Sequence, residues 1–153
     1  DDDWYWGDSH TETVTRVGAP DVPLPGIDEF GPVGDAVLTR GYRLPARYVL
    51  HTLGPHLNGG EITDEDREKL AACYTSCLDL ALEKGDIHNV SFCALSTGRN
   101  NFPFEEATHI ALDTVNQWLQ YHGTDVIELV VFNIFEDADA EGYMQALESW
   151  VED

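Results

Sequence analysis

The spacing of apolar and polar residues changes several times along the chain, and each change predicts a new element. Residues 36–44 (AVLTRGYRL) alternate as a half-buried strand does. Residues 48–54 (YVLHTLG) are more continuously apolar, which favours a central strand. Residues 89–96 (NVSFCALS) and 126–135 (VIELVVFNIF) predict two further buried strands. We therefore expect four strands between residues 36 and 135.

Three segments have apolar residues at helical spacing. The first begins at Thr63, a capping residue before an acidic turn, and ends at Gly85. The second opens at Pro103 and ends at Gly123, and the third starts near Asp137. The side chains expected to face inward are Leu70, Tyr74, Cys77, Leu78 and Ala81 in the first, Ala107, Ile110, Ala111, Thr114 and Trp118 in the second, and Tyr143, Leu147, Trp150 and Val151 in the third.

The order of these elements predicts a three-layer α/β/α fold with a mostly parallel or mixed sheet. Residues 1–35 differ from the rest, because they hold nine acids against the single Arg16 and four of the seven prolines. Within them, residues 11–17 alternate as a strand does and residues 18–32 resemble irregular loop. We therefore divide the chain into an irregular acidic segment, 1–35, and an α/β domain, 36–153.

The charge narrows the classes of partner. The chain has 29 acids and 8 bases, a net charge of −21, which argues against binding to nucleic acid or to an anionic membrane. Adaptation to high salt is one explanation of such a surface. No apolar run approaches the roughly 20 residues of a membrane span. Cys73, Cys77 and Cys93 lie in apolar surroundings, as buried reduced thiols do, so we expect a cytoplasmic protein.

Candidate chemistry gathers where strands end. In an open α/β sheet, ligands bind beyond the carboxyl ends of the strands. Residues 96–102 (STGRNNF) follow a strand and precede a helix, so backbone N–H groups and the helix N-terminus can face an anion, and Arg99 adds a positive charge. The alternative is that the Ser-Thr-Gly segment is an ordinary turn that binds no ligand. His56, which follows another strand end, is a weaker candidate for a ligand contact, and His51 is expected to be a core histidine.

Four segments together resemble the second half of a macrodomain over residues 31–151. They are GDAVLTRGYRLPARYVLHTLGPH, LAACYTSCLDLALEKG, SFCALSTGRNNFPFEEATHIALDTV and VVFNIF, and the most specific parts are LPARYVLHTLGP and the STG-x-x-x-FP loop. The likeness is greatest to the zinc-containing microbial branch of protein ADP-ribosyl hydrolases. It implies binding of ADP-ribose, an ADP-ribosylated protein as partner, and hydrolysis of mono-ADP-ribose from that protein. A non-catalytic reader and a remnant kept for interaction are the alternatives.

The resemblance also assigns site residues. Around the diphosphate and distal ribose it places Ser96, Thr97, Gly98, Arg99, Asn100, Asn101 and Phe102, with Phe102 as a wall beside the ribose, and near the adenosine Asn133 and Phe135. Asn101 stands where the family has a second loop glycine, and Asn tolerates the left-handed backbone conformation.

The N-terminal strands and first loop of the family have no counterpart in residues 1–35. The resemblance therefore assigns no catalytic residue and no zinc ligand here, although it implies zinc as a cofactor. A truncated, split or degenerate macrodomain would have an incomplete sheet with one poorly covered face. We expect a homo-oligomer or another partner to cover it.

Overall fold

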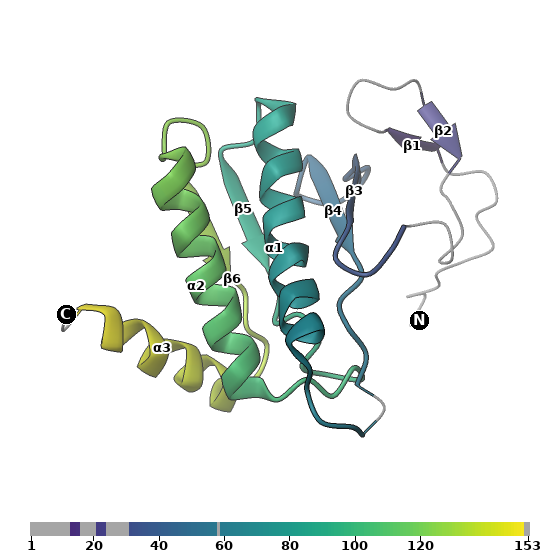
Figure 1. Ribbon diagram of the computed structural model, residues 1–153. Coiled ribbons are helices and arrows are strands. Elements are labelled where there is room, and N and C mark those ends of the chain that lie inside the picture. Colours follow the sequence, from purple (N-terminus) through teal and green to yellow (C-terminus); the bar gives the residue numbers. More distant parts are fainter. Residues whose placement is uncertain (1–12, 16–20, 24–30, 58, 152–153) are drawn as a thin grey trace.

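The computed structural model describes residues 13–15, 21–23, 31–57 and 59–151. Strands and helices alternate in the second part of the chain, as the sequence predicts (Figure 1). The elements are β1 (Thr13–Thr15), β2 (Asp21–Pro23), β3 (Ala36–Arg40), β4 (Tyr48–Thr52), α1 (Asp64–Lys84), β5 (Asn89–Phe92), α2 (Phe104–His122), β6 (Leu129–Phe132) and α3 (Asp137–Val151).

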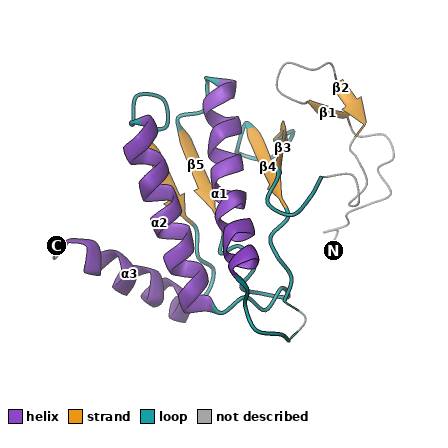
Figure 2. Cartoon of the chain, viewed as in Figure 1, coloured by secondary structure: helices purple, strands orange, loops and turns teal. Residues whose placement is uncertain are grey.

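The strands that the structure describes form three separate ladders of two strands each. β1 pairs with β2 and β3 with β4 in antiparallel registers, whereas β5 and β6 are parallel. No ladder joins β4 to β5 in the described part of the chain. Figure 2 shows α1 and α2 side by side in front of β5, with β3 and β4 beside α1. The α/β class and the mixed pairing of the strands are confirmed.

Two local signals position α1. The Thr63 hydroxyl accepts a hydrogen bond from the backbone N–H of Asp66, and the Asp66 carboxylate accepts one from the backbone N–H of Thr63. At the other end Gly85 has φ 79°, a left-handed conformation that glycine adopts without strain. The predicted inward face of this helix is confirmed, since Leu70, Tyr74, Cys77, Leu78 and Ala81 are all buried.

Removal of this cap should destabilise the protein measurably. We expect Thr63→Ala to lower the free energy of unfolding by about 1 kcal/mol, because the Thr63 hydroxyl no longer accepts from the Asp66 N–H or donates to its carboxylate. Urea denaturation followed by circular dichroism measures the change. Thr75→Ala is the matched control, since Thr75 lies in the middle of the same helix and Ala is favourable there. An equal loss in both variants would contradict the capping argument.

Several expectations for the helices and strands differ from the structure. In α2 the core includes Leu112 and Val115, whereas Ile110 and Thr114 are only half-buried. In α3 Tyr143 is buried as predicted, but Leu147 is 38% exposed because nothing described packs over that turn. The side chains of Trp150 and Val151 lie outside the described residues.

The strands are also shorter than their apolar runs. For example, β6 spans only Leu129–Phe132 of the ten residues from 126 to 135. The prediction of irregular loop over residues 18–32 was wrong for Asp21–Pro23, where pairing with β1 imposes an extended conformation. His51 was expected to be a core histidine, but it is only half-buried; its Nε2 lies 2.9 Å from Thr39 Oγ1, and burial lowers its pKa.

One face of the parallel ladder is uncovered in the described structure. Val90 and Phe92 of β5 point into the core beneath the helices and are buried. On the opposite face of β6, Leu129 is 52% and Val131 is 42% exposed. This is the exposed apolar surface that an incomplete sheet was expected to leave. None of the described helices combines the length and the apolar character that crossing a membrane requires.

Candidate ligand-binding site

The loop of residues 96–102 is a compact turn held by its own backbone. The N–H of Phe102 donates to the carbonyl of Ser96 at 2.9 Å, and the N–H of Asn101 donates to that of Gly98 at 3.0 Å. Ser96 and Asn101 have φ values of 62° and 56°. The left-handed conformation expected at Asn101 is therefore present, and Ser96 adopts it as well, which no sequence signal indicated.

A second strand end packs against this loop. The Asn100 carbonyl accepts from the Leu57 N–H at 2.9 Å, and its side-chain amide donates to the Gly54 carbonyl at 3.3 Å. His56 Nδ1 lies 3.2 Å from Asn100 Oδ1. Asn100, predicted as a ligand contact, thus ties the loops after β4 and β5 together.

Gly54 is a residue that sequence reasoning missed. A Cβ built on Gly54 would lie 2.0 Å from the Oγ of Ser96 and 3.3 Å from its Cβ, so glycine leaves room for the Ser96 hydroxyl where the two loops meet. Its signal in the sequence was the Gly-Pro pair that follows the apolar strand. A larger residue at this position would force the Ser96 hydroxyl out of its place.

Two polar groups of the loop have no partner among the described residues. The Oγ of Ser96 is buried, yet it forms no hydrogen bond within the described structure. Such an atom needs a ligand or an ordered water, because a buried polar group without a partner is destabilising. Arg99 is exposed and forms no ion pair with any described residue, whereas Lys69 and Lys84 bind Glu65 and Asp86. Of these two groups, the exposed Arg99 guanidinium is the one that an anion can reach.

The start of α2 adds to this electrostatic environment. The N-cap residue is Pro103, and no side chain caps the helix there. Its first backbone N–H groups and the positive end of its dipole therefore lie directly after the loop. Gly98 is exposed, and a Cβ placed on it would meet nothing within 4 Å, so the surface beside the turn is open.

The remaining predicted site residues fall into two groups. The Thr97 hydroxyl donates to the Ala94 carbonyl at 3.3 Å, and the Phe102 ring is only 2% exposed within the hydrophobic core. Phe102 therefore anchors the loop and offers a ligand almost no surface as a wall. Asn133 and Phe135 are exposed after β6, and the Phe135 ring is 98% exposed. Because β5 and β6 are parallel, both of their carboxyl ends lie at one edge.

A family model supplies the decisive comparison. The model of the Macro domain matches residues 26–111, more than half of the 153 residues. The chain belongs to the Macro domain family. A protein-ADP-ribose hydrolase of Staphylococcus aureus is 44% identical to this macrodomain over 115 residues, which are 75% of this chain and 42% of that protein.

Solved macrodomains share the fold. The Oceanobacillus iheyensis macrodomain with ADP is 37% identical, with a TM-score of 0.72 over 79% of this chain and 60% of that one. The Trypanosoma brucei macrodomain in complex with ADP-ribose is 38% identical, with a TM-score of 0.67 over 76% of this chain and 46% of that one. This macrodomain spans about 42% of the length of the curated relative from S. aureus.

The described residues do not fit the zinc that the family resemblance implies. Among them, no group of three or more His, Cys, Asp or Glu side chains could hold a metal ion. Cys73 and Cys77 are buried in the core, where burial raises the pKa of both thiols and so disfavours the thiolate that zinc binds. We therefore derive no step through zinc.

The three cysteines should differ sharply in reactivity. Burial raises the pKa of Cys77 to about 12 and that of Cys73 above its ordinary value, so both stay protonated at pH 8. Cys93 is exposed. We expect a disulfide reagent such as Ellman's to modify one thiol rapidly in the native protein and three in guanidinium chloride. Rapid reaction of two or three native thiols would contradict the described packing of α1.

Proposed function

We propose that this macrodomain binds ADP-ribose at the loop of residues 96–102 and hydrolyses the bond between ADP-ribose and a modified protein. One observation carries most weight: an exposed Arg99 that forms no ion pair with a described residue lies in a turn directly before the uncapped start of α2, on a chain whose net charge is −21. The names of the relatives support the ligand, since one is a protein-ADP-ribose hydrolase and one was solved with ADP-ribose.

In this proposal each group has a separate task. The diphosphate lies over Gly98, where the open backbone lets it approach, and the Arg99 guanidinium pairs with its charge. The exposed Phe135 ring stacks on the adenine, with Asn133 beside it.

Hydrolysis requires water to attack the distal ribose carbon as the bond to the protein side chain breaks. The contribution of these residues is to fix the orientation of the ribose and to stabilise charge on the diphosphate.

Calorimetry with ADP-ribose tests the ligand. We expect micromolar affinity for ADP-ribose in low salt, and weaker but measurable affinity in molar salt, because ions screen the contact with Arg99. A mono-ADP-ribosylated protein then tests the reaction, with release of free ADP-ribose as the readout. If the folded protein gives no heat of binding with ADP-ribose at either salt concentration, the proposal is wrong.

A second function is favoured by the absence of an assigned catalytic group in the described structure. A reader of ADP-ribosylated proteins needs only the anion-binding turn and the adenosine contacts. It would bind ADP-ribose with the same affinity and release none from a modified protein. Binding of ADP-ribose without release from a modified protein over many hours would therefore favour the non-catalytic function.

A further inference from the structure

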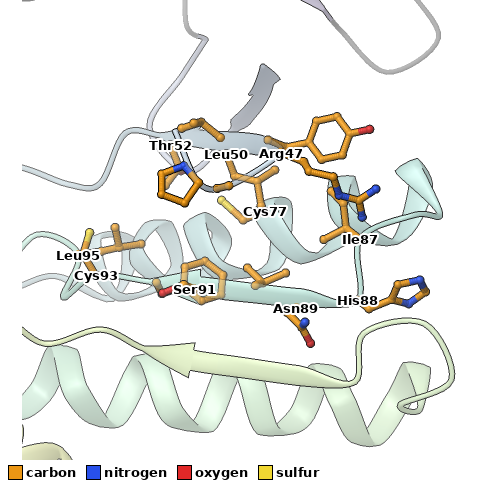
Figure 3. Close-up of a pocket in the computed structure, with 16 residues that line it drawn as sticks. Arg47, Leu50, Thr52, Cys77, Ile87, His88, Asn89, Ser91, Cys93 and Leu95 are labelled. Carbon is orange, nitrogen blue, oxygen red and sulfur yellow. The ribbon is translucent and has the colours of Figure 1, made fainter. Parts of the chain in front are cut away.

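The loops after β4 and β5 meet beyond two strands that do not pair with each other. No ladder joins β4 to β5 in the part of the chain that the structure describes, and a cavity of about 560 Å³ lies between them (Figure 3). Hydrogen bonds between the loops tie the two strand ends together. Asn100 forms three of these bonds, all with residues 54–57.

The hydrogen bonds of Asn100 fix the orientation of its side-chain amide. Its Nδ2 donates to the Gly54 carbonyl at 3.3 Å, and its Oδ1 lies 3.2 Å from Nδ1 of His56. A flipped amide would place the oxygens of Asn100 and Gly54 against each other, and neither oxygen can donate. The Leu57 N–H also donates to the Asn100 backbone carbonyl at 2.9 Å, which holds the backbone in place. The Oδ1 of Asn100 therefore faces His56.

This orientation determines which nitrogen of the His56 ring carries the hydrogen. An amide oxygen only accepts hydrogen bonds, so Nδ1 of His56 must donate to Asn100. A neutral imidazole has a single N–H group, and Nε2 is then left as an acceptor. The His56 side chain is exposed, and its Nε2 has no partner among the described residues. A proton gained at Nε2 makes the ring a cation and leaves the bond to Asn100 intact.

His56 lies beside the part of the loop that is proposed to hold the diphosphate. It contacts Asn100, and Asn100 directly follows Arg99, the exposed guanidinium that is proposed to pair with the ligand. The whole chain has 8 Lys and Arg residues against 29 acids. A second positive charge at this turn therefore acts on the same anion as Arg99, in a protein whose overall field repels anions.

We propose, on the basis of the function proposed above, that His56 belongs to the ADP-ribose site and that its protonation strengthens binding of the diphosphate. A histidine side chain gains its positive charge between about pH 8 and about pH 5. The two phosphates of ADP-ribose keep their negative charges over this range, since each is a strong acid. The cationic ring attracts the ligand more strongly than the neutral ring does, so affinity rises as the pH falls.

The neighbouring charged groups leave this response to the imidazole. Apart from His56, the charged side chains within residues 53–67 and 96–107 are Glu61, Asp64, Glu65, Asp66, Arg67, Arg99, Glu105 and Glu106. Arg67 binds both Asp64 and Glu106, which lie at the starts of α1 and α2. Carboxylates and guanidinium groups ordinarily keep their charges above about pH 5.5. Within these two segments, the ring of His56 is therefore the group whose charge changes.

Calorimetry with ADP-ribose at several pH values tests the role of His56. In low salt, we expect the Kd to fall about fivefold from about pH 8 to about pH 5.5, the effect of one added unit charge at close range in water. The response should shrink in molar salt, because ions screen the charge. Binding near the middle of this range should also take up protons, which titration in two buffers of different ionisation enthalpy measures. Circular dichroism at each pH confirms the fold.

His56→Gln separates the charge of the ring from its hydrogen bond. The Gln amide can donate to Oδ1 of Asn100 as the imidazole does, but it gains no charge. We expect this variant to bind ADP-ribose at about pH 8 with nearly the original affinity and to lose the increase at about pH 5.5.

His88→Gln is the matched control. His88 is also exposed, and its Nδ1 also donates to an oxygen, the Val126 carbonyl at 2.8 Å. It directly precedes β5, at the opposite end of that strand from the loop of residues 96–102. The His88→Gln variant should therefore keep the full pH response. Loss of the response in this variant as well would overturn the assignment to His56.

The hydrogen on Nδ1 can be observed without a ligand. We expect nitrogen-15 NMR of the neutral ring of His56 to show an N–H group at Nδ1 and a bare Nε2, with the signals assigned by their absence in the His56→Gln variant. A hydrogen on Nε2 in the neutral ring would overturn the orientation of Asn100 and, with it, the proposed role of His56.

The calorimetry distinguishes failure of this proposal from failure of the ADP-ribose site. Equal affinity at both ends of the pH range, or a response that persists in the His56→Gln variant, would overturn the role of His56 and leave the ADP-ribose site in place. A response that is as large in molar salt would show that the ring does not act through its charge, and would overturn the proposal too. A folded protein that binds no ADP-ribose at any pH would overturn both.

Discussion

Gly98→Glu is expected to weaken the binding of ADP-ribose at least about thirtyfold while the protein stays folded. A side chain at this position meets no atom within 4 Å, and its backbone is not left-handed, so the substitution introduces no steric or conformational strain. The new carboxylate stands where the diphosphate is proposed to lie. Repulsion of about 2 kcal/mol or more between this carboxylate and the diphosphate accounts for the weaker binding. Calorimetry measures the affinity, and thermal unfolding confirms the fold.

Two controls separate charge from bulk and from a general effect of acidity. Gly98→Ala adds a methyl group without charge and should retain most of the affinity. Gly60→Glu adds the same charge to a glycine in the loop before α1, where a side chain also meets nothing within 4 Å. Undiminished binding by the Gly98→Glu variant, or equal loss by the Gly60→Glu variant, would remove the loop from the proposed site.

Phe102→Ala is expected to lower the free energy of unfolding by about 3–5 kcal/mol, the largest effect on stability among these predictions. The ring is 2% exposed and belongs to the hydrophobic core, so truncation leaves a cavity beneath the loop. A domain of this kind is stable by only about 5–15 kcal/mol, and the variant should therefore unfold at a markedly lower urea concentration.

Phe135→Ala is the matched control because it makes the same chemical change on the surface. Its ring is 98% exposed, so the free energy of unfolding should change by less than about 0.5 kcal/mol. Its affinity for ADP-ribose should fall severalfold, since an aromatic contact of about 1 kcal/mol is removed. A stable Phe102→Ala variant would contradict the described core, and unchanged affinity in Phe135→Ala would remove the proposed adenine contact.

The helices were predictable because their signals are local. Thr63 and Gly85 lie at the ends of α1 and carry the chemistry of a cap. The faces of α1 followed from the 3.6-residue period. In α2 the helical period was recognised, but the predicted core residue Thr114 is half-buried and Val115 is buried instead. Contact with α1 decides which side of α2 turns inward.

The strands and the loop depend on partners that lie far away in the sequence. The apolar run of β4 indicated a central strand, yet no periodicity shows that its second edge faces a cavity. Ser96 and Gly98 were enough to predict a ligand-binding loop, and the family resemblance predicted that Asn100 contacts the ligand. Its hydrogen bond to Gly54 spans 46 positions and leaves no local signature.

The separate ladders also set the order in which the chain folds. Only residues 41–47 divide β3 from β4, so their hairpin closes a short loop and should form within about 1–10 μs. β5 and β6 are divided by residues 93–128, and their ladder must wait until α2 has crossed over them. A newly synthesised chain therefore displays a finished hairpin before its parallel counterpart exists. In that interval its open edge is most exposed to aggregation.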